Sequence, residues 1–263
     1  MTQPQFEDVI YEVRSNAGWI IINRPKVYNA FRGRTVEELI QAFQLAANNR
    51  AVASIVLTGA GEKAFCTGGD QSAHDGNYDG RGVVGLPIEE LQGLIRDVHK
   101  PVIARVNGFA IGGGNVLATL CDLTIAAEHA KFAQVGPKVG SFDAGWGTSL
   151  LARHVGDKRA REIWFLNEQL TAQQAFNYGL VNKVVPMAEL DAAVTAWTDT
   201  IAERSPTALA FLKRSFNADS DSIRGISNMA LQAVKLFYAT EESKEGVNAF
   251  NEKRRPDFRK FAD

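Results

Sequence analysis

The sequence carries two glycine clusters, Cys66-Thr67-Gly68-Gly69-Asp70-Gln71 and Ile111-Gly112-Gly113-Gly114-Asn115. An apolar run typical of a strand precedes each cluster, residues 55–58 the first and residues 101–106 the second. Glycines leave backbone amides without side-chain cover, and open α/β sheets bind ligands beyond the ends of their strands. The clusters therefore predict two amides that stabilise a developing oxyanion. Tight packing of a helix on a strand is the alternative explanation for either cluster taken alone.

Neither cluster is a nucleotide-binding loop. The phosphate-binding loop needs Lys-Ser/Thr after its last glycine, and the dinucleotide motif needs a third glycine at fixed spacing with an acidic residue about 20 residues later. Both features are missing from this sequence. The clusters therefore favour an oxyanion hole.

The composition narrows the class of protein. The 263 residues are 45% hydrophobic and 22% charged, which is enough to bury a full core in an ordinary globular domain. A net charge of -1 provides no field that attracts nucleic acid or a membrane surface, so neither is an expected partner. The N-terminal residues lack a signal-peptide pattern, and no apolar run approaches the roughly 20 residues that span a bilayer. Cys66 and Cys121 lack metal-ligand spacing, and we expect a cytoplasmic protein with reduced thiols in which Cys66 is a buried residue and not a nucleophile.

Two kinds of pattern succeed one another along the chain and predict an α/β fold. Up to about residue 135, β-type runs alternate with helical periodicity, and after residue 147 the pattern is almost entirely helical. The expected strands are residues 9–13, 19–22, 55–58, 102–106, 123–125 and 180–185, and the expected helices are residues 35–47, 88–98, 149–154, 159–166, 171–178, 187–203, 207–217 and 223–242. Residues 72–86 are irregular, with four glycines among polar residues, and are a candidate lid over an active site.

Five motifs spread over the whole chain carry a family resemblance. They are Asn23-Arg24-Pro25, Ala64-Phe65-Cys66-Thr67-Gly68-Gly69-Asp70, Asn107-Gly108-Phe109-Ala110-Ile111-Gly112-Gly113-Gly114, Cys121-Asp122-Leu123 and Gly179-Leu180-Val181. Together they resemble the crotonase superfamily of enoyl-CoA hydratases and isomerases. The resemblance implies a ββα spiral superhelix over residues 1–200 and a helical region over residues 201–263 that mediates oligomerisation and contacts coenzyme A. It also implies an acyl-CoA substrate, a homotrimer or homohexamer, and a thioester oxygen held by the amides of Gly69 and Gly113.

The chain departs from the hydratases of this superfamily at two positions. Those hydratases carry one catalytic glutamate two residues after the glycine triplet and another in the next loop, where they handle the protons of water. These positions align here with Val116 and Gly136. Simple hydration of an enoyl-CoA is therefore not expected.

The run Gln134-Val135-Gly136-Pro137-Lys138-Val139-Gly140-Ser141-Phe142-Asp143-Ala144-Gly145-Trp146-Gly147 resembles one branch of the superfamily. This branch contains 2-ketocyclohexanecarboxyl-CoA hydrolase, which opens a ring with water, and 1,4-dihydroxy-2-naphthoyl-CoA synthase, which closes one. Residues 68–91 are closer to the hydrolase, and Tyr28 stands where the synthases carry an arginine that contacts the coenzyme. The expected activity is hydrolysis of 2-ketocyclohexanecarboxyl-CoA to pimeloyl-CoA, a reverse Dieckmann reaction. The synthase reaction and a non-catalytic acyl-CoA-binding protein are the two alternatives.

Five side chains are candidates for the proton transfers of ring opening. Asp143, with Ser141 two residues earlier, is expected to activate or position the water, and its alternative role is to cap the helix that follows. Tyr78 and Tyr238 match the branch and are candidate donors to the ketone oxygen or to carbon, with ordinary packing as the alternative. His74, in the expected lid, is either a proton shuttle or an exposed histidine without function.

The other expected contacts are with the substrate and coenzyme A. The residues are Thr67, Gly68, Asp70, Gln71, Phe109, Ile111, Gly112, Gln134, Gly136 and Lys253. The resemblance implies that Lys253 binds a phosphate of coenzyme A across a subunit boundary. Gln134 and Gly136 correspond to the place where some synthases hold bicarbonate, so bicarbonate is a possible ligand. No metal or other cofactor is expected, because His and carboxylates do not recur at ligand spacing.

Overall fold

The computed structural model describes residues 5–73, 78 and 80–262 of the chain, and its strands form two sheets. The larger sheet has the order β1-β2-β3-β5-β7-β10, in which β1 is Val9–Arg14, β2 is Ala17–Ile22, β3 is Ser54–Gly59, β5 is Val102–Val106, β7 is Leu123–Ala127 and β10 is Lys183–Val185. β1 and β2 form an antiparallel hairpin, and the other neighbours are parallel. These strands are the ones that the apolar runs of the sequence predict.

The smaller sheet consists of strands only two or three residues long. Its order is β4-β6-β8-β9, in which β4 is Ala64–Cys66, β6 is Phe109–Ile111, β8 is Lys131–Ala133 and β9 is Leu170–Thr171. The predicted runs 55–58 and 101–106 form β3 and β5, but a further short strand, β4 or β6, lies between each run and its glycine cluster. The sequence analysis missed these two strands because a three-residue strand is too short to show a periodic pattern. Both clusters still begin where two neighbouring strands end, since β4 pairs with β6 in parallel.

The helices cover the sheets and form most of the C-terminal half. They are α1 (Gly33–Asn48), α2 (Ile88–Asp97), α3 (Gly113–Leu120), α4 (Leu151–Val155), α5 (Asp157–Leu166), α6 (Ala172–Asn177), α7 (Leu190–Ala202), α8 (Pro206–Ala218), α9 (Ser222–Tyr238) and α10 (Glu241–Asn251), and a π-helical turn (Trp146–Leu150) leads into α4. The single helix predicted over residues 223–242 is wrong. Thr240 starts a new helix, because its hydroxyl accepts a hydrogen bond from the Ser243 N–H, and Tyr238 therefore ends α9.

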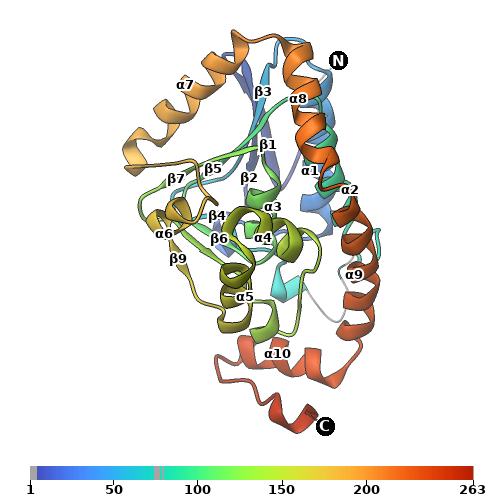
Figure 1. Ribbon diagram of the computed structural model, residues 1–263. Helices are drawn as coiled ribbons and strands as arrows, with labels where there is room; N and C mark the ends of the chain where they lie inside the picture. The colour runs from blue at the N-terminus through green and yellow to red at the C-terminus, as the bar shows by residue number, and fades with distance from the viewer. Residues whose placement is uncertain (1–4, 74–77, 79, 263) are drawn as a thin grey trace.

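Apolar side chains between the sheets and the helices form the core. Phe43 of α1, Phe65 of β4, Phe132 of β8 and Trp146 of the π-helical turn are almost completely buried. Figure 1 shows α8 and α9 running down one side of the molecule and α10 crossing its lower end near the C-terminus, and α9 packs against α2 and the π-helical turn. The C-terminal helices thus fold back onto the α/β part of the same chain. Within the described residues, no helix combines the length and apolarity needed to cross a membrane.

Candidate active site

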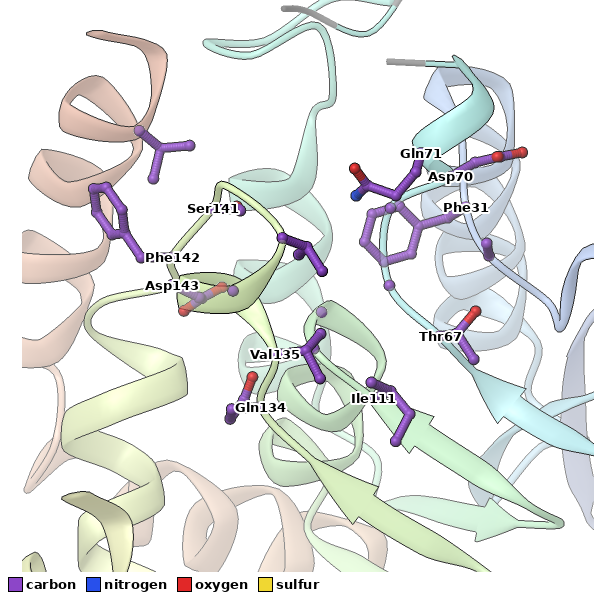
Figure 2. Close-up of a pocket in the computed structure, with 18 of the residues that line it drawn as sticks. Phe31, Thr67, Asp70, Gln71, Ile111, Gln134, Val135, Ser141, Phe142 and Asp143 are labelled. Carbon is purple, nitrogen blue, oxygen red and sulfur yellow. The ribbon is translucent and has the colours of Figure 1, made fainter. Parts of the chain in front are cut away.

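A cavity of about 630 Å³ lies between the glycine loops, α2, residues 134–144 and α9. Figure 2 shows Phe31, Thr67, Asp70 and Gln71 on one side of it and Ser141, Phe142 and Asp143 on the other. The predicted site residues that line it are Thr67, Gly68, Gly69, Asp70, Gln71, Tyr78, Phe109, Ile111, Gly112, Gly113, Gln134, Gly136, Ser141, Asp143 and Tyr238. Residues far apart in the sequence are therefore brought to one cavity.

The amide of Gly69 is oriented by a bridge to Phe31. The Phe31 N–H donates to the Gly68 carbonyl (2.8 Å), and the Asp70 N–H donates to the Phe31 carbonyl (2.9 Å). Because a trans peptide directs its C=O and N–H in opposite directions, the Gly69 N–H points away from Phe31. Among the described residues this N–H has no acceptor, so it is available to a ligand in the cavity that Gly69 lines.

Gly113 supplies a second amide from the first turn of α3. The first N–H groups of an α-helix have no acceptor within the helix and carry the positive end of its dipole. The two glycine loops are in contact, because a Cβ atom on Gly68 would lie 3.0 Å from the Gly113 nitrogen. Gly68 also has a φ of +83°, which other residues rarely adopt. Two neighbouring amide donors thus line one cavity, an arrangement suited to an oxyanion.

The loop that carries Asp143 is held by the C-terminal helices. A Cβ atom on Gly140 would lie 2.1 Å from the Ser243 carbonyl oxygen of α10, and the Ser243 hydroxyl donates to the Gly140 carbonyl at 2.6 Å. A Cβ atom on Gly145 would lie 2.7 Å from Ser227 of α9. Both glycines have positive φ, so only glycine fits these close approaches. α9 and α10 therefore fix the path of this loop.

Asp143 contributes a carboxyl group to the cavity wall. Its Oδ1 accepts a hydrogen bond from the Gly147 N–H at 2.9 Å, so the capping role considered from the sequence is also present. Burial raises the pKa of Asp143 to about 6, although this hydrogen bond favours the ionised form. A carboxyl group with this pKa is mostly ionised at neutral pH and is more basic than an ordinary aspartate. Its position and pKa suit a general base.

Two tyrosine hydroxyls lie at the same cavity as Asp143. The Tyr238 hydroxyl is 2.9 Å from Oγ of Ser141. The Tyr78 hydroxyl lies against Gly69, since a Cβ atom on that glycine would be 1.9 Å from it. Burial raises the pKa of both tyrosines above the usual value. Both hydroxyls therefore stay protonated at neutral pH and can donate hydrogen bonds or protons.

The two positions that the family resemblance aligns with the hydratase glutamates, Val116 and Gly136, hold no carboxylate. Val116 is 1% exposed and belongs to the apolar core. A Cβ atom on Gly136 would lie 2.6 Å from the Ser141 carbonyl oxygen, so a side chain there would displace the loop that carries Asp143. The cavity thus offers Asp143 in place of the carboxylates of the hydratases.

Asp70 and Gln134 line the cavity in different states. Asp70 Oδ2 pairs with Arg24 at 2.8 Å, and its Oδ1 accepts hydrogen bonds from the N–H and the hydroxyl of Ser72. Gln134 is 1% exposed, and neither atom of its side-chain amide has a hydrogen-bond partner among the residues that the structure describes. A buried amide without partners is costly, and a polar ligand that bonded to it would offset this cost. The side-chain amide of Gln134 can therefore bind a polar ligand, whereas the carboxylate of Asp70 is already engaged by Arg24 and Ser72.

Two of the predicted substrate and coenzyme A contacts, Thr67 and Phe109, lie against Tyr28. The Thr67 hydroxyl donates to the Tyr28 carbonyl at 3.3 Å, and the Tyr28 ring meets Phe109 edge-on with centroids 6.2 Å apart. Phe250, near the end of α10, also lines the cavity. Lys253 is exposed and does not line it, so its contact with coenzyme A stays a prediction.

Sequence reasoning missed the apolar wall of the cavity. This wall consists of Val84, Leu86, Ile88, Ala230, Leu231 and Val234, and Gln92 of α2, 2% exposed, adds an amide to it. Ile88 and Gln92 are one helical turn apart, as are Ala230 and Val234, and such spacing is typical of any core helix. The sequence pattern therefore contains no signal that separates these residues from ordinary core.

The remaining predictions concern His74, Cys66 and metal binding. His74 lies outside the described residues, so its role stays a prediction. Burial raises the pKa of Cys66 to about 12, and this thiol is therefore not a nucleophile at neutral pH. Within residues 5–73, 78 and 80–262, no three His, Cys, Asp or Glu side chains gather where they would hold a metal ion.

Comparisons with known proteins agree with the fold and the cavity. The profile of the family described as Enoyl-CoA hydratase/isomerase matches residues 12–260. An enoyl-CoA hydratase from Mycobacterium avium subsp. paratuberculosis K-10 superposes with a TM-score of 0.86 at 26% identity, over 97% of this chain and 99% of the other. A carnitinyl-CoA hydratase from Mycobacterium avium superposes with a TM-score of 0.82 at 32% identity, over 96% and 98%. An enoyl-CoA hydratase from Bacillus anthracis gives 0.72 at 28% identity, over 96% and 99%.

The two sheets and the helices are those of a crotonase-type α/β fold. The chain belongs to the enoyl-CoA hydratase/isomerase family, whose members are acyl-CoA enzymes.

Proposed function

We propose that this protein uses water to open the ring of a cyclic β-keto acyl-CoA thioester, converting 2-ketocyclohexanecarboxyl-CoA to pimeloyl-CoA with the thioester bond intact. One observation carries the proposal: Val116 and Gly136 replace the hydratase carboxylates, while Asp143, with a pKa raised to about 6, lines the same cavity as the amides of Gly69 and Gly113. A base with a pKa near neutrality suits the activation of water. The similar structures are named as hydratases, but the two positions that the family resemblance aligns with the hydratase glutamates hold Val116 and Gly136, so we do not extend hydration to this chain.

Ring opening begins with the addition of water to the ketone carbon. Asp143 accepts one proton as the water oxygen bonds to that carbon, and the ketone oxygen becomes an alkoxide. When the alkoxide collapses to a carboxyl group, the bond to the carbon next to the thioester breaks, and its electron pair forms a thioester enolate. The proton held by Asp143 then returns to that carbon, directly or through Ser141 and Tyr238. One water is consumed for each ring opened, and its oxygen stays in the new carboxylate.

The two glycine amides and the two tyrosine hydroxyls of the cavity each have a place in this scheme. The N–H groups of Gly69 and Gly113 hold the thioester oxygen, where negative charge grows only as the carbon–carbon bond breaks. Tyr78 and Tyr238 are protonated at neutral pH and donate to the ketone oxygen, where the alkoxide forms. The apolar wall on α2 and α9 suits the methylene groups of the ring.

The ligand and assembly expectations also stand as proposals. Lys253 binds a phosphate of coenzyme A, and the chain assembles as a homotrimer or homohexamer through its C-terminal helices. Strongly exposed apolar side chains on α8 and α9 support this assembly: Phe211, Phe216, Met229 and Leu236. Bicarbonate is a proposed ligand at Gln134, and its addition to the assay buffer tests whether it changes turnover.

The deciding experiment is product analysis by mass spectrometry. The purified protein is mixed with 2-ketocyclohexanecarboxyl-CoA in water enriched in oxygen-18. We expect pimeloyl-CoA with one labelled oxygen in its new carboxylate and no label in the thioester carbonyl. Free coenzyme A would instead indicate ordinary thioester hydrolysis.

Survival of the keto thioester would overturn the assignment. The next substrate would then be o-succinylbenzoyl-CoA, whose conversion to a naphthoyl thioester would assign the ring-closing reaction of the synthases. Failure with both substrates, together with tight binding of acyl-CoA, would favour a binding protein.

A further inference from the structure

The loop that presents Gly69 is joined to the segment of Phe31 by two backbone hydrogen bonds. The Gly68 carbonyl accepts one of these bonds and the Asp70 N–H donates the other, so the two bonds flank Gly69. They therefore fix the peptide plane whose N–H points away from Phe31. Whatever holds this bridge also sets the direction of the Gly69 N–H.

Arg24 contacts the segments on both sides of the bridge with one guanidinium group. Its Nη2 pairs with Asp70 Oδ2 at 2.8 Å, on the side of Gly69, and its Nη1 donates to the Ala30 carbonyl at 2.5 Å, next to Phe31. The Asp70 side chain is 8% exposed and that of Arg24 is 15% exposed, so solvent screens the pair weakly. A planar fork with several fixed donors is a property of arginine that lysine lacks.

Buried groups of the protein in turn hold Arg24 in place. Its Nε lies 3.6 Å from Asp8 Oδ2, and its backbone N–H donates to Asn29 Oδ1 at 3.0 Å. Asp8 is anchored by the Thr35 hydroxyl of α1 at 2.6 Å. The guanidinium group is thus fixed to α1 on one side and to the glycine loop on the other.

The Asp70 carboxylate is also ionised when it makes this contact. Burial opposes its ionisation, but hydrogen bonds from Ser72 and Arg24 lower its pKa below the usual value. An anion therefore lies one residue after the amide that faces the thioester oxygen. Left unpaired, its charge would oppose a developing enolate, and Arg24 neutralises it.

We propose that Arg24 and Asp70 are positioning residues for the oxyanion hole: their ion pair aligns the Gly69 N–H with the thioester oxygen. The pair touches no reacting atom and acts only through the Gly69 peptide. This inference rests on the proposed role of Gly69 in binding the thioester oxygen. This inference does not depend on the identity of the acyl group in the substrate.

The test uses the infrared carbonyl stretch of a bound thioester. The probe is cyclohexanecarboxyl-CoA labelled with carbon-13 at the thioester carbonyl, which lacks the ketone and is not a substrate for ring opening. Hydrogen bonds to the oxygen lower the stretching frequency, so the wild-type protein is expected to shift the band downward on binding. In Arg24→Gln and Asp70→Asn the shift is expected to shrink while the probe still binds, and kcat for the ring substrate falls about 10- to 100-fold with a smaller change in KM. Asp70→Asn keeps the shape of the side chain and serves if Arg24→Gln fails to fold.

A matched control separates positioning from stability. Lys213→Met removes another, partly buried ion pair, that between Lys213 and Asp122 at 2.6 Å, and neither residue lines the cavity. It is expected to lower thermal stability and leave the carbonyl band at the wild-type position. A full band shift in both Arg24→Gln and Asp70→Asn would overturn the positioning role and leave the proposed function intact. Absence of any shift in the wild type would overturn the oxyanion hole and this inference together.

Discussion

The hydroxyl of Tyr238 lies 2.9 Å from Oγ of Ser141, although 97 positions separate the two residues in the chain. Tyr238 ends α9, and Ser141 belongs to the loop that also carries Asp143. The bond therefore links the C-terminal helices to the candidate base. In the proposed reaction, these two hydroxyls carry the proton from Asp143 to the substrate carbon.

Tyr238→Phe is expected to slow turnover while leaving binding nearly intact. The substitution removes one hydroxyl and keeps the ring in a buried site, so kcat should fall about 10- to 100-fold with little change in KM. Steady-state kinetics on the ring substrate measures this. Ser141→Ala should have a similar effect, and the double variant should be little worse than either single one, because both act on the same path. Independent, multiplicative losses would contradict a shared path.

Asp143→Asn is expected to abolish ring opening. The amide keeps an oxygen that can accept the hydrogen bond from the Gly147 N–H, but it cannot accept a proton from water. We expect a decrease in kcat of about 100-fold or more, with acyl-CoA binding by calorimetry close to that of the wild type. Substantial turnover by this variant would assign the base to another group.

The pH profile should report the same carboxyl group. The pKa of Asp143 is raised to about 6 by burial, and only the ionised form is a base. The rate should therefore fall as pH decreases through about 6, tenfold for each further pH unit. A rate that stays constant down to pH 4.5 would mean that Asp143 is not the group that must be ionised.

Asp143→Asn should also stabilise the fold at neutral pH. Because folding raises the pKa of Asp143 from 3.8 to about 6, the folded state binds more protons than the unfolded state between these values. Stability is therefore lost as pH rises through this window, and the uncharged variant avoids the loss. Denaturant unfolding at pH 7 should show the variant about 1 to 3 kcal/mol more stable. The difference should shrink as the pH is lowered toward 4, and an equal difference at both pH values would contradict this origin.

Gly136→Ala should damage the active-site loop. The added Cβ would lie 2.6 Å from the Ser141 carbonyl oxygen, so the loop must shift, and we expect a loss of about 1 to 3 kcal/mol with reduced turnover. Gly225→Ala in α9 is the control, because a Cβ there meets nothing within 4 Å. It should be neutral or stabilising by up to about 1 kcal/mol. Thermal unfolding of both variants, with kinetics, tests the contrast.

Local patterns predict much of the fold. The apolar runs predict β1, β2, β3, β5 and β7, and the capping box of Thr171 and Gln174 starts α6 as expected. The short strands β4, β6, β8 and β9 escape prediction, because segments of two or three residues show no period. The bend after Tyr238 is missed because helical residues continue on both sides, and only the Thr240 cap marks it.

The residues of the candidate site were likewise predictable only in part. Glycine clusters and the loop of residues 134–147 are local motifs, so their residues are found from the sequence together with the family resemblance. The contact of Arg24 with Asp70 and Ala30, and the presence of Gln92 in the cavity wall, are not visible there. Arginine near a proline, or glutamine on a helix, is common on any protein surface.

The sequence by itself determined the chemical groups: two glycine-rich amide loops, a carboxyl group at Asp143, and no carboxylate at Val116 or Gly136. Only the tertiary structure decided that these groups lie around one cavity, that the Asp143 carboxyl is buried enough for its pKa to reach about 6, and that Arg24 spans the bridge behind Gly69. The physical reason is that burial and alignment depend on contacts between distant segments. Local residue patterns carry little information about such contacts.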